Sequence, residues 1–206
     1  MSKGYFITFE GGDGSGKSTQ IELLKDYLTD KGYNVILTRE PGGTPISEKI
    51  RNIILDNENA EMCDMTETML YAAARAQLVD QVIKPAVDRG DIVICDRFVD
   101  SSIAYQAYGR GLGDVVWDIN KNAVSSYMPD LTVLLKLDPE KGMNRIKGRE
   151  QDRIESSSDD FHRRVYEGYL KLEEEFPDRI KGIDASRGID EIAGYIRGVV
   201  EDLIVK

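Results

Sequence analysis

A glycine-rich segment near the N-terminus has the residue types and spacing needed to bind phosphate. It runs from Phe9 to Thr19 and fits the pattern G-x-x-x-x-G-K-[ST] between Gly11 and Ser18. A strand-like run precedes it and a helix-like run follows it, so its backbone N–H groups and the helix N-terminus can meet an anion. This context argues against a chance match to a glycine-rich turn. We therefore predict that nucleotide phosphates are bound by Gly11, Gly12, Asp13, Gly14, Ser15, Gly16, Lys17, Ser18 and Thr19.

Residues beside this loop could hold a magnesium ion. The Ser18 hydroxyl is the expected Mg²⁺ ligand of the motif, and Lys17 is expected to reach the β- and γ-phosphates. The apolar run 92–95 leads into Asp96, a pattern that resembles the second acidic motif of phosphate-loop proteins, whose aspartate holds Mg²⁺. Arg97 follows directly and is expected to point into the same cleft. The alternative for Asp96 and Arg97 is a buried structural ion pair.

Further polar residues could bind a second ligand. Arg39 follows a predicted strand in a Pro- and Gly-rich loop, although a solvated arginine in a plain connector explains it equally well. Tyr71 and Arg75 share a helix face at i and i+4, so a ring could stack on a base while a guanidinium donates to a base carbonyl. The alternative is an amphipathic helix with a solvated Arg75. About one face of another predicted helix carries the hydrogen-bonding residues Ser102, Tyr105 and Gln106.

A basic segment at 145–156 contrasts with the net charge of −10 of the whole chain. Its cations are Arg145, Lys147, Arg149 and Arg153. A charged run is usually a solvated face, and that alternative stays open. The segment lies, however, between a predicted strand and a long helix, where mobile lids close over phosphates in small kinases. Positive groups that arrive on closure would stabilise charge on a transferring phosphoryl group.

Short apolar runs alternate with helix-like segments along the chain. We predict strands at 5–10, 34–38, 91–95, 131–137 and 180–184, without clean alternation, as in strands buried on both faces of a parallel sheet. Helices are predicted at 17–31, 45–55, 66–89, 100–108, 114–127, 139–148, 159–175 and 189–204. This order predicts an α/β fold in three layers, α/β/α, around a five-stranded parallel sheet. Ligands of such sheets bind at the C-terminal strand ends, where the motifs above lie.

Composition limits the class of protein. The 206 residues suit a single domain, 1–206, that contains the lid. The acidic net charge argues against a nucleic-acid partner, and no apolar run approaches the ~18 residues that a membrane helix needs. Without a visible signal peptide, a cytoplasmic location is expected. Cys63 and Cys95 form no metal-binding pattern, and His162, the only histidine, is expected to be exposed.

Taken in order, these motifs resemble those of thymidylate kinases, a family of nucleoside-monophosphate kinases with a P-loop NTPase fold. The matching pieces span nearly the whole chain, at 9–19, 39–44, 71–75, 96–98, 101–106 and 152–155. The resemblance implies that ATP and dTMP give ADP and dTDP with Mg²⁺ as cofactor. Ser186, in the loop that resembles the part of the family near adenine, and Arg149 are expected to bind ATP. A homodimer is also implied, with long helices at its interface.

The resemblance implies roles for the residues that would face dTMP. Arg39 and Arg97 match positions near its phosphate. Tyr71 stands where relatives usually place a phenylalanine on thymine, and Arg75 matches the donor to a thymine carbonyl. Tyr105 matches the aromatic side chain under the deoxyribose. The segment that reads the base edge contains Ser102 and Gln106.

The loop also indicates a class within the family. Asp13 is similar to the carboxylate that contacts the region of the sugar 3′-hydroxyl. Some thymidylate kinases carry an arginine directly after it, but Gly14 stands here. The other class places its catalytic basic residue in the lid, where Arg153 fits that role and Arg149 is a second candidate. The expected catalytic set is Asp13, Lys17, Arg97 and Arg153.

Two other functions compete with this interpretation. One is a kinase for a different nucleotide or for a deoxynucleoside, and assays with a panel of substrates would distinguish it from a thymidylate kinase. The other is a nucleotide-dependent switch or partitioning protein, which would hydrolyse ATP slowly without an acceptor and respond to a macromolecular partner. The acidic charge and the lid-like arginine cluster argue against the second.

Overall fold

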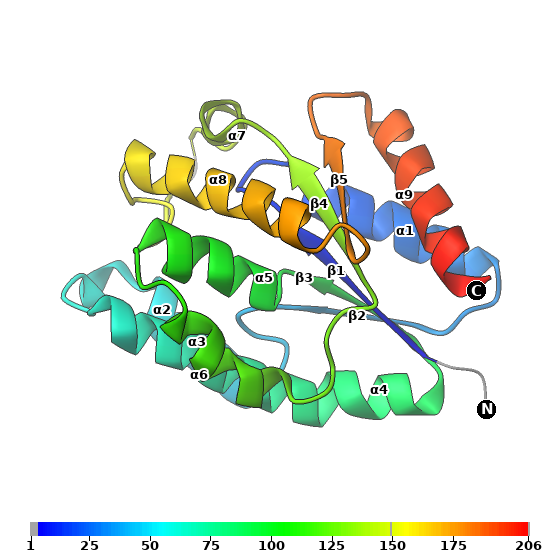
Figure 1. Ribbon diagram of the computed structural model, residues 1–206, viewed down its shortest axis with the longest axis horizontal. Coiled ribbons are helices and arrows are strands. Elements are labelled where there is room, and N and C mark those ends of the chain that lie inside the picture. The colour runs from blue at the N-terminus through cyan, green and yellow to red at the C-terminus, as the bar shows by residue number, and fades with distance from the viewer. Residues whose placement is uncertain (1–3, 149, 206) are drawn as a thin grey trace.

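A five-stranded parallel sheet forms the centre of the computed structural model, which describes residues 4–148 and 150–205. The strands lie in the order β2-β3-β1-β4-β5 (Figure 1). Their bounds are β1 Tyr5–Glu10, β2 Val35–Arg39, β3 Ile92–Asp96, β4 Leu131–Lys136 and β5 Ile180–Asp184. The register places Phe9 beside Asp96. Because β1 is central, the phosphate loop leaves the middle of the sheet.

Helices cover both faces of the sheet and complete three layers (Figure 1). On one face, Ile7 of β1 belongs to a core with residues of α1 (Lys17–Asp30) and α9 (Ile189–Ile204). On the other face, Phe6 packs with residues from the segments between β2 and β4. The remaining α-helices are α2 Pro45–Leu55, α3 Asp64–Leu78, α4 Lys84–Arg89, α5 Val99–Ser102, α6 Val115–Val124, α7 Pro139–Arg145 and α8 Asp159–Glu175. The predicted α/β fold class is confirmed.

Two helical regions are less regular than predicted. The helix expected at 66–89 is α3 and α4 joined by a π-helical segment, Val79–Ile83. Pro85 explains the change, because it has no N–H for the carbonyl one turn earlier. A second π-helical segment, Ile103–Gly109, follows α5 and carries Tyr105 and Gln106. Such segments are frequent at functional sites, because they re-aim side chains.

Some expectations about element ends and burial are wrong. Strand β2 is half-buried rather than buried on both faces, because it lies at the edge of the sheet. A 3₁₀ helix at Asn57–Asn59 was not predicted, and α7 ends at Arg145 instead of 148. His162 is buried, not exposed: its ring packs edge-on against Phe161, and its Nε2 lies 3.2 Å from the Glu155 carbonyl oxygen. No helix among the described residues is long and apolar enough to span a membrane.

Candidate active site

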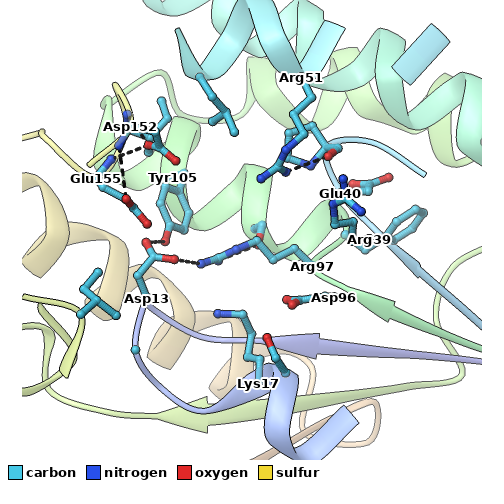
Figure 2. A pocket seen from close by; sticks show the side chains of 18 of the residues that line it. Asp13, Lys17, Arg39, Glu40, Arg51, Asp96, Arg97, Tyr105, Asp152 and Glu155 are labelled. Atoms are coloured by element: carbon cyan, nitrogen blue, oxygen red, sulfur yellow. Dashed lines mark hydrogen bonds and ion pairs between the residues drawn. The ribbon is translucent and has the colours of Figure 1, made fainter. Parts of the chain in front are cut away.

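The sequence motifs surround one cleft at the C-terminal ends of the strands (Figure 2). It encloses about 850 Å³, and residues of the phosphate loop, β2, α3, α5 and the lid line its walls. Gly11, Gly12 and Ser15 belong to the loop but do not line this cleft. The predicted site residues that line it are Asp13, Gly14, Gly16, Lys17, Ser18, Thr19, Arg39, Tyr71, Arg75, Asp96, Arg97, Ser102, Tyr105 and Gln106.

The phosphate loop needs glycine at position 14 for two reasons. Gly14 has φ +73°, which favours glycine, and an added Cβ would lie 2.3 Å from the carbonyl oxygen of Gly142 in α7. Arg145, at the end of α7, donates to the Gly14 carbonyl at 3.2 Å and to the Ala185 carbonyl at 3.3 Å. The close packing of α7 therefore excludes any side chain at position 14.

Lys17 lies inside the curl of the loop. Its Nζ donates to the carbonyl oxygens of Gly11 and Gly12 at 3.0 and 3.1 Å. Burial, with the nearby charge of Arg97, lowers the pKa of Lys17 to about 8. A phosphate group in the loop would give this ammonium group a full negative charge to bind in place of two carbonyl oxygens.

Asp96 and Ser18 fit a magnesium ion that is shared with a nucleotide. The buried Oδ1 of Asp96 has no hydrogen-bond partner among the residues that the structure describes. Ser18 is exposed at the first turn of α1 and lines the same cleft. No group of three or more His, Cys, Asp or Glu side chains in the described chain could hold a metal ion. Oxygen donors such as phosphates would therefore have to complete the coordination of Mg²⁺.

Asp13 and Arg97 form an ion pair across the cleft (Figure 2). Arg97 has φ +70°, an uncommon conformation for a non-glycine residue, and its Nη2 donates to Asp13 Oδ1 at 2.8 Å. The guanidinium also lies 5.1 Å from the centre of the Tyr105 ring, and the Tyr105 hydroxyl lies 3.5 Å from Asp13 Oδ2. Burial opposes ionisation of Asp13, but Arg97 and Lys17 hold its pKa below the ordinary value.

A buried carboxylate that the sequence interpretation missed supports Arg97. Glu10 accepts hydrogen bonds from the Phe98 N–H at 2.7 Å, the Ser101 hydroxyl at 2.5 Å and the Tyr169 hydroxyl at 3.0 Å. Ser101 and Tyr169 in turn accept from Arg97 Nη1 at 3.3 and 3.2 Å. Burial and the nearby Asp100 raise the pKa of Glu10 to about 7.

Arg75 is fully buried, which excludes the solvated alternative. Its Nε and Nη2 both donate to Glu40, and Nη2 also donates to the Phe98 carbonyl. Its Nη1 donates to Ser102 and to Asn120. An arginine has five N–H groups, so each one has an acceptor among the described residues. Donation to a thymine carbonyl would therefore require a ligand to replace one of these acceptors.

The other predicted base- and phosphate-binding residues differ in how firmly they are held. Arg39 is exposed and pairs with Glu48 at 3.0 Å, while still lining the cleft. Tyr71 is half-buried, and burial, with the nearby Glu67, raises the pKa of its hydroxyl, which stays neutral. Gln106 is buried and donates from Nε2 to Glu67 at 2.9 Å.

The structure divides the residues predicted for the lid. Arg145, Lys147 and Asp152 line the cleft, but Arg153 does not. Its guanidinium donates to Glu67 instead, so Arg153 would have to leave this partner to reach a phosphate in the cleft. Arg149, the second candidate, lies outside the described residues.

Ser186, which was predicted to bind ATP, does not line the cleft. It is exposed and hydrogen-bonds to Asp184, although Arg145 links the neighbouring Ala185 carbonyl to that of Gly14 in the phosphate loop.

The missed residues left uneven traces in the sequence. Glu10 is the last residue of β1, and Glu40 directly follows β2. The reasoning from strand ends that identified Asp96 could therefore have identified both. Glu67 lies one helical turn before Tyr71 and shares its face. Tyr169, in α8, has no local signal, because only the fold brings it to Glu10.

Comparisons with known proteins agree with this geometry. A family model described as "Thymidylate kinase" matches residues 9–196. A thymidylate kinase of Geobacillus sp. (strain WCH70) is 50% identical over 206 residues, covering 98% of both chains. One from Clostridium novyi (strain NT) is 46% identical over 205 residues, covering 98% of this chain and 100% of the other. A crystal structure of thymidylate kinase from Ehrlichia chaffeensis superposes with a TM-score of 0.79 at 34% identity, covering 97% of this chain and 99% of that one.

Proposed function

This chain belongs to the thymidylate kinase family and phosphorylates dTMP to dTDP, and from that premise we propose which residues carry out the reaction. The observation that supports the assignment is the single cleft that joins the phosphate loop to Arg75, Arg97 and Tyr105. A donor nucleotide on the loop and a monophosphate among these residues would have their phosphates face to face. Phosphoryl transfer depends mainly on such positioning and on charge stabilisation.

For the donor half of the site, we propose ATP with Mg²⁺. Lys17 and the backbone N–H groups of residues 11–19 would hold its phosphates. Ser18 and Asp96 would hold the ion, Asp96 either directly or through water. The chemistry that Mg²⁺ supplies when bound is neutralisation of phosphate charge.

For the acceptor half, we propose that Arg97 and Arg39 hold the dTMP phosphate. Asp13 would face the sugar 3′-hydroxyl region, and the Tyr105 ring would crowd a 2′-hydroxyl. Tyr71 would stack on thymine. Arg75, Ser102 and Gln106 would hydrogen-bond to the edge of the thymine base. A phosphate monoester is largely ionised at pH 7, so the attacking oxygen needs no strong general base.

We propose that the segment 145–156 acts as the lid within the single domain and supplies positive charge to the transferring group. The sequence favours Arg153 for this role and Arg149 after it. Because Glu67 binds Arg153, we assign the charge to Arg149, with Lys147 on the cleft wall, and Arg153 could take part only by leaving Glu67.

We also propose that the protein is a homodimer through the faces of α2, α3 and α6. Helix α3 packs against both α2 and α6. Large apolar side chains stay exposed on these helices: Ile46, Ile53, Met69, Val115 and Trp117. Exposed apolar patches of this kind mark interfaces. We further propose that the protein is located in the cytoplasm. Its two cysteines, Cys63 and Cys95, are free thiols, as is usual in that reducing compartment.

A substrate panel tests the proposal. ADP release from ATP and Mg²⁺ is measured with each nucleoside monophosphate in turn. We expect turnover of dTMP, weaker turnover of dUMP because one methyl group is worth about 1–3 kcal/mol, and little with dCMP or dAMP. Equal turnover of dCMP or dAMP would contradict the base-reading residues. ATP hydrolysis that ignores every acceptor would favour a nucleotide-dependent switch.

A further inference from the structure

One buried carboxylate, that of Glu67 in α3, receives donors from two other parts of the chain. Gln106 Nε2 donates to it at 2.9 Å and Arg110 Nη2 at 3.1 Å, both from the region after α5. Arg153 Nη2 donates to it from the lid at 2.7 Å. Glu67 has no exposed surface. Glu67 therefore joins α3, the π-helical segment Ile103–Gly109 and the lid at one point.

Three hydrogen bonds hold Arg153, which does not line the cleft. Besides the bond to Glu67, its Nε donates to the Ile54 carbonyl at 2.8 Å, and its backbone N–H donates to the Leu55 carbonyl at 3.2 Å. Asp152 and Ile154, its two neighbours, line the cleft, whereas Arg153 does not. Holding Arg153 at these acceptors thus fixes the cleft-lining residues on either side of it.

The same carboxylate fixes Gln106, at the end of the cleft proposed to bind the nucleotide base. Gln106 lines the cleft, and its Nε2 is committed to Glu67. This bond leaves the amide Oε1 as the acceptor that an N–H of a pyrimidine base can meet. Tyr71, one helical turn after Glu67, lines the cleft as well.

Glu67 is ionised in this arrangement. Burial alone would raise its pKa, but Arg110, Gln106 and Arg153 together hold it below the ordinary value. Arg110 is kept in place by Asp64, at 3.4 Å, and by the Phe161 ring, 4.4 Å from its guanidinium carbon. A charged acceptor between two arginines resists loss of either partner, because an unpaired charge would then stay buried.

We propose that Glu67 is a positioning residue that couples a pyrimidine base bound at Gln106 to the placement of the lid through Arg153. When the base fixes Gln106, it also fixes the carboxylate that holds the lid. The inference deepens the proposed function and rests on dTMP as the ligand of this end of the cleft.

The test measures hydrogen exchange of lid peptides covering 150–157, with and without dTMP, and steady-state kinetics. The variants are Glu67→Gln, Arg153→Met and the double variant. Asp64→Asn is the matched control, because it removes an exposed partner of Arg110 and leaves Glu67 in place. In the wild type and in Asp64→Asn, we expect dTMP alone to slow exchange of the lid.

In Glu67→Gln and Arg153→Met we expect dTMP to lose this effect on the lid and kcat to fall about 10-fold, with no further fall in the double variant. The KM for ATP should change little. Lid protection by dTMP that persists in Glu67→Gln would overturn the proposal. So would a normal kcat in Glu67→Gln beside a loss of several powers of ten in Arg153→Met.

Two controls keep the result interpretable. Thermal unfolding of each variant shows whether it folds, and Arg153→Lys, which keeps a charge for Glu67 and loses the Nε donor to Ile54, should recover part of the protection. If wild-type protein neither turns over dTMP nor shows dTMP-dependent exchange anywhere in the cleft, the proposed function fails first. If dTMP protects the cleft and not the lid, the coupling alone fails.

Discussion

Arg97 Nη2 donates to Asp13 Oδ1 at 2.8 Å, although the two residues lie 84 positions apart in the chain. The pair joins the phosphate loop, which would hold the donor, to the strand end that would hold the acceptor phosphate. Glu10, through Ser101 and Tyr169, supports the same arginine from behind. The charge of Arg97 is therefore placed before a substrate arrives.

Replacing Arg97 should weaken acceptor binding and transfer together. A charge-assisted hydrogen bond is worth about 1.5–3 kcal/mol, so we expect Arg97→Gln to lower kcat/KM for dTMP by about 10- to 100-fold. The KM for ATP should change less. Steady-state kinetics with both substrates measure this, and Arg187→Gln, in an exposed ion pair with Glu191, is the control that should behave as wild type.

Arg75 should matter for stability as well as for substrate choice. Removing one partner of a buried ion pair costs about 3–5 kcal/mol, so Arg75→Met should lower the free energy of unfolding by that amount. Arg39→Met removes an exposed pair in the same cleft and should cost at most about 1 kcal/mol, while raising the KM for dTMP. Urea unfolding compares the two. Equal stability losses would contradict the buried network around Glu40.

The lid arginines should separate by kinetics. A positioned arginine contributes about three to five powers of ten in rate, so we expect Arg149→Ala to lower kcat by at least about 10³-fold with little change in KM. Arg153→Ala should lower kcat by only about 10-fold, because its partner is Glu67. The reverse order would return Arg153 to the transferring phosphoryl group.

Lys17 should give the free enzyme a basic limb in its pH profile. Its pKa, lowered to about 8, means that the ammonium form is lost as pH rises through that value. We therefore expect kcat/KM for ATP to fall above about pH 8. Because bound phosphates favour the charged form, kcat at saturating ATP should hold to higher pH. A flat kcat/KM profile up to about pH 9.5 would contradict this assignment.

Glu10 should make stability depend on pH in the opposite sense to most carboxylates. Its pKa is raised to about 7, so the folded state binds the proton more tightly, and this stabilisation is lost as pH rises through about 7. From about pH 6 to about pH 8 the free energy of unfolding should fall by about 1.4 kcal/mol. Urea titrations of the wild type and Glu10→Gln measure it, and the variant should lack most of this slope.

Much of the fold and of the cleft could be predicted from local sequence. Alternating apolar runs and helices predicted the parallel sheet because βαβ crossovers follow from that order. Asp96, Arg97 and Arg39 were predicted as site residues from their positions at strand ends, because the C-terminal ends of parallel strands lie at one edge of the sheet. The edge position of β2 and the π-helical turns were not predictable, since strand order and hydrogen-bond shifts depend on packing.

The sequence by itself determined the phosphate loop, because glycine conformations, the lysine and the hydroxyl act within one short segment. It could not determine the partners of the buried charges. Glu10 meets Tyr169 across 159 positions, and Arg153 meets Glu67 across 86. A buried charged residue requires an opposite charge or a hydrogen bond, but only the packing of distant segments decides which group supplies it. That is why only the tertiary structure showed that Arg75 is buried against Glu40 and that Arg153 pairs with Glu67.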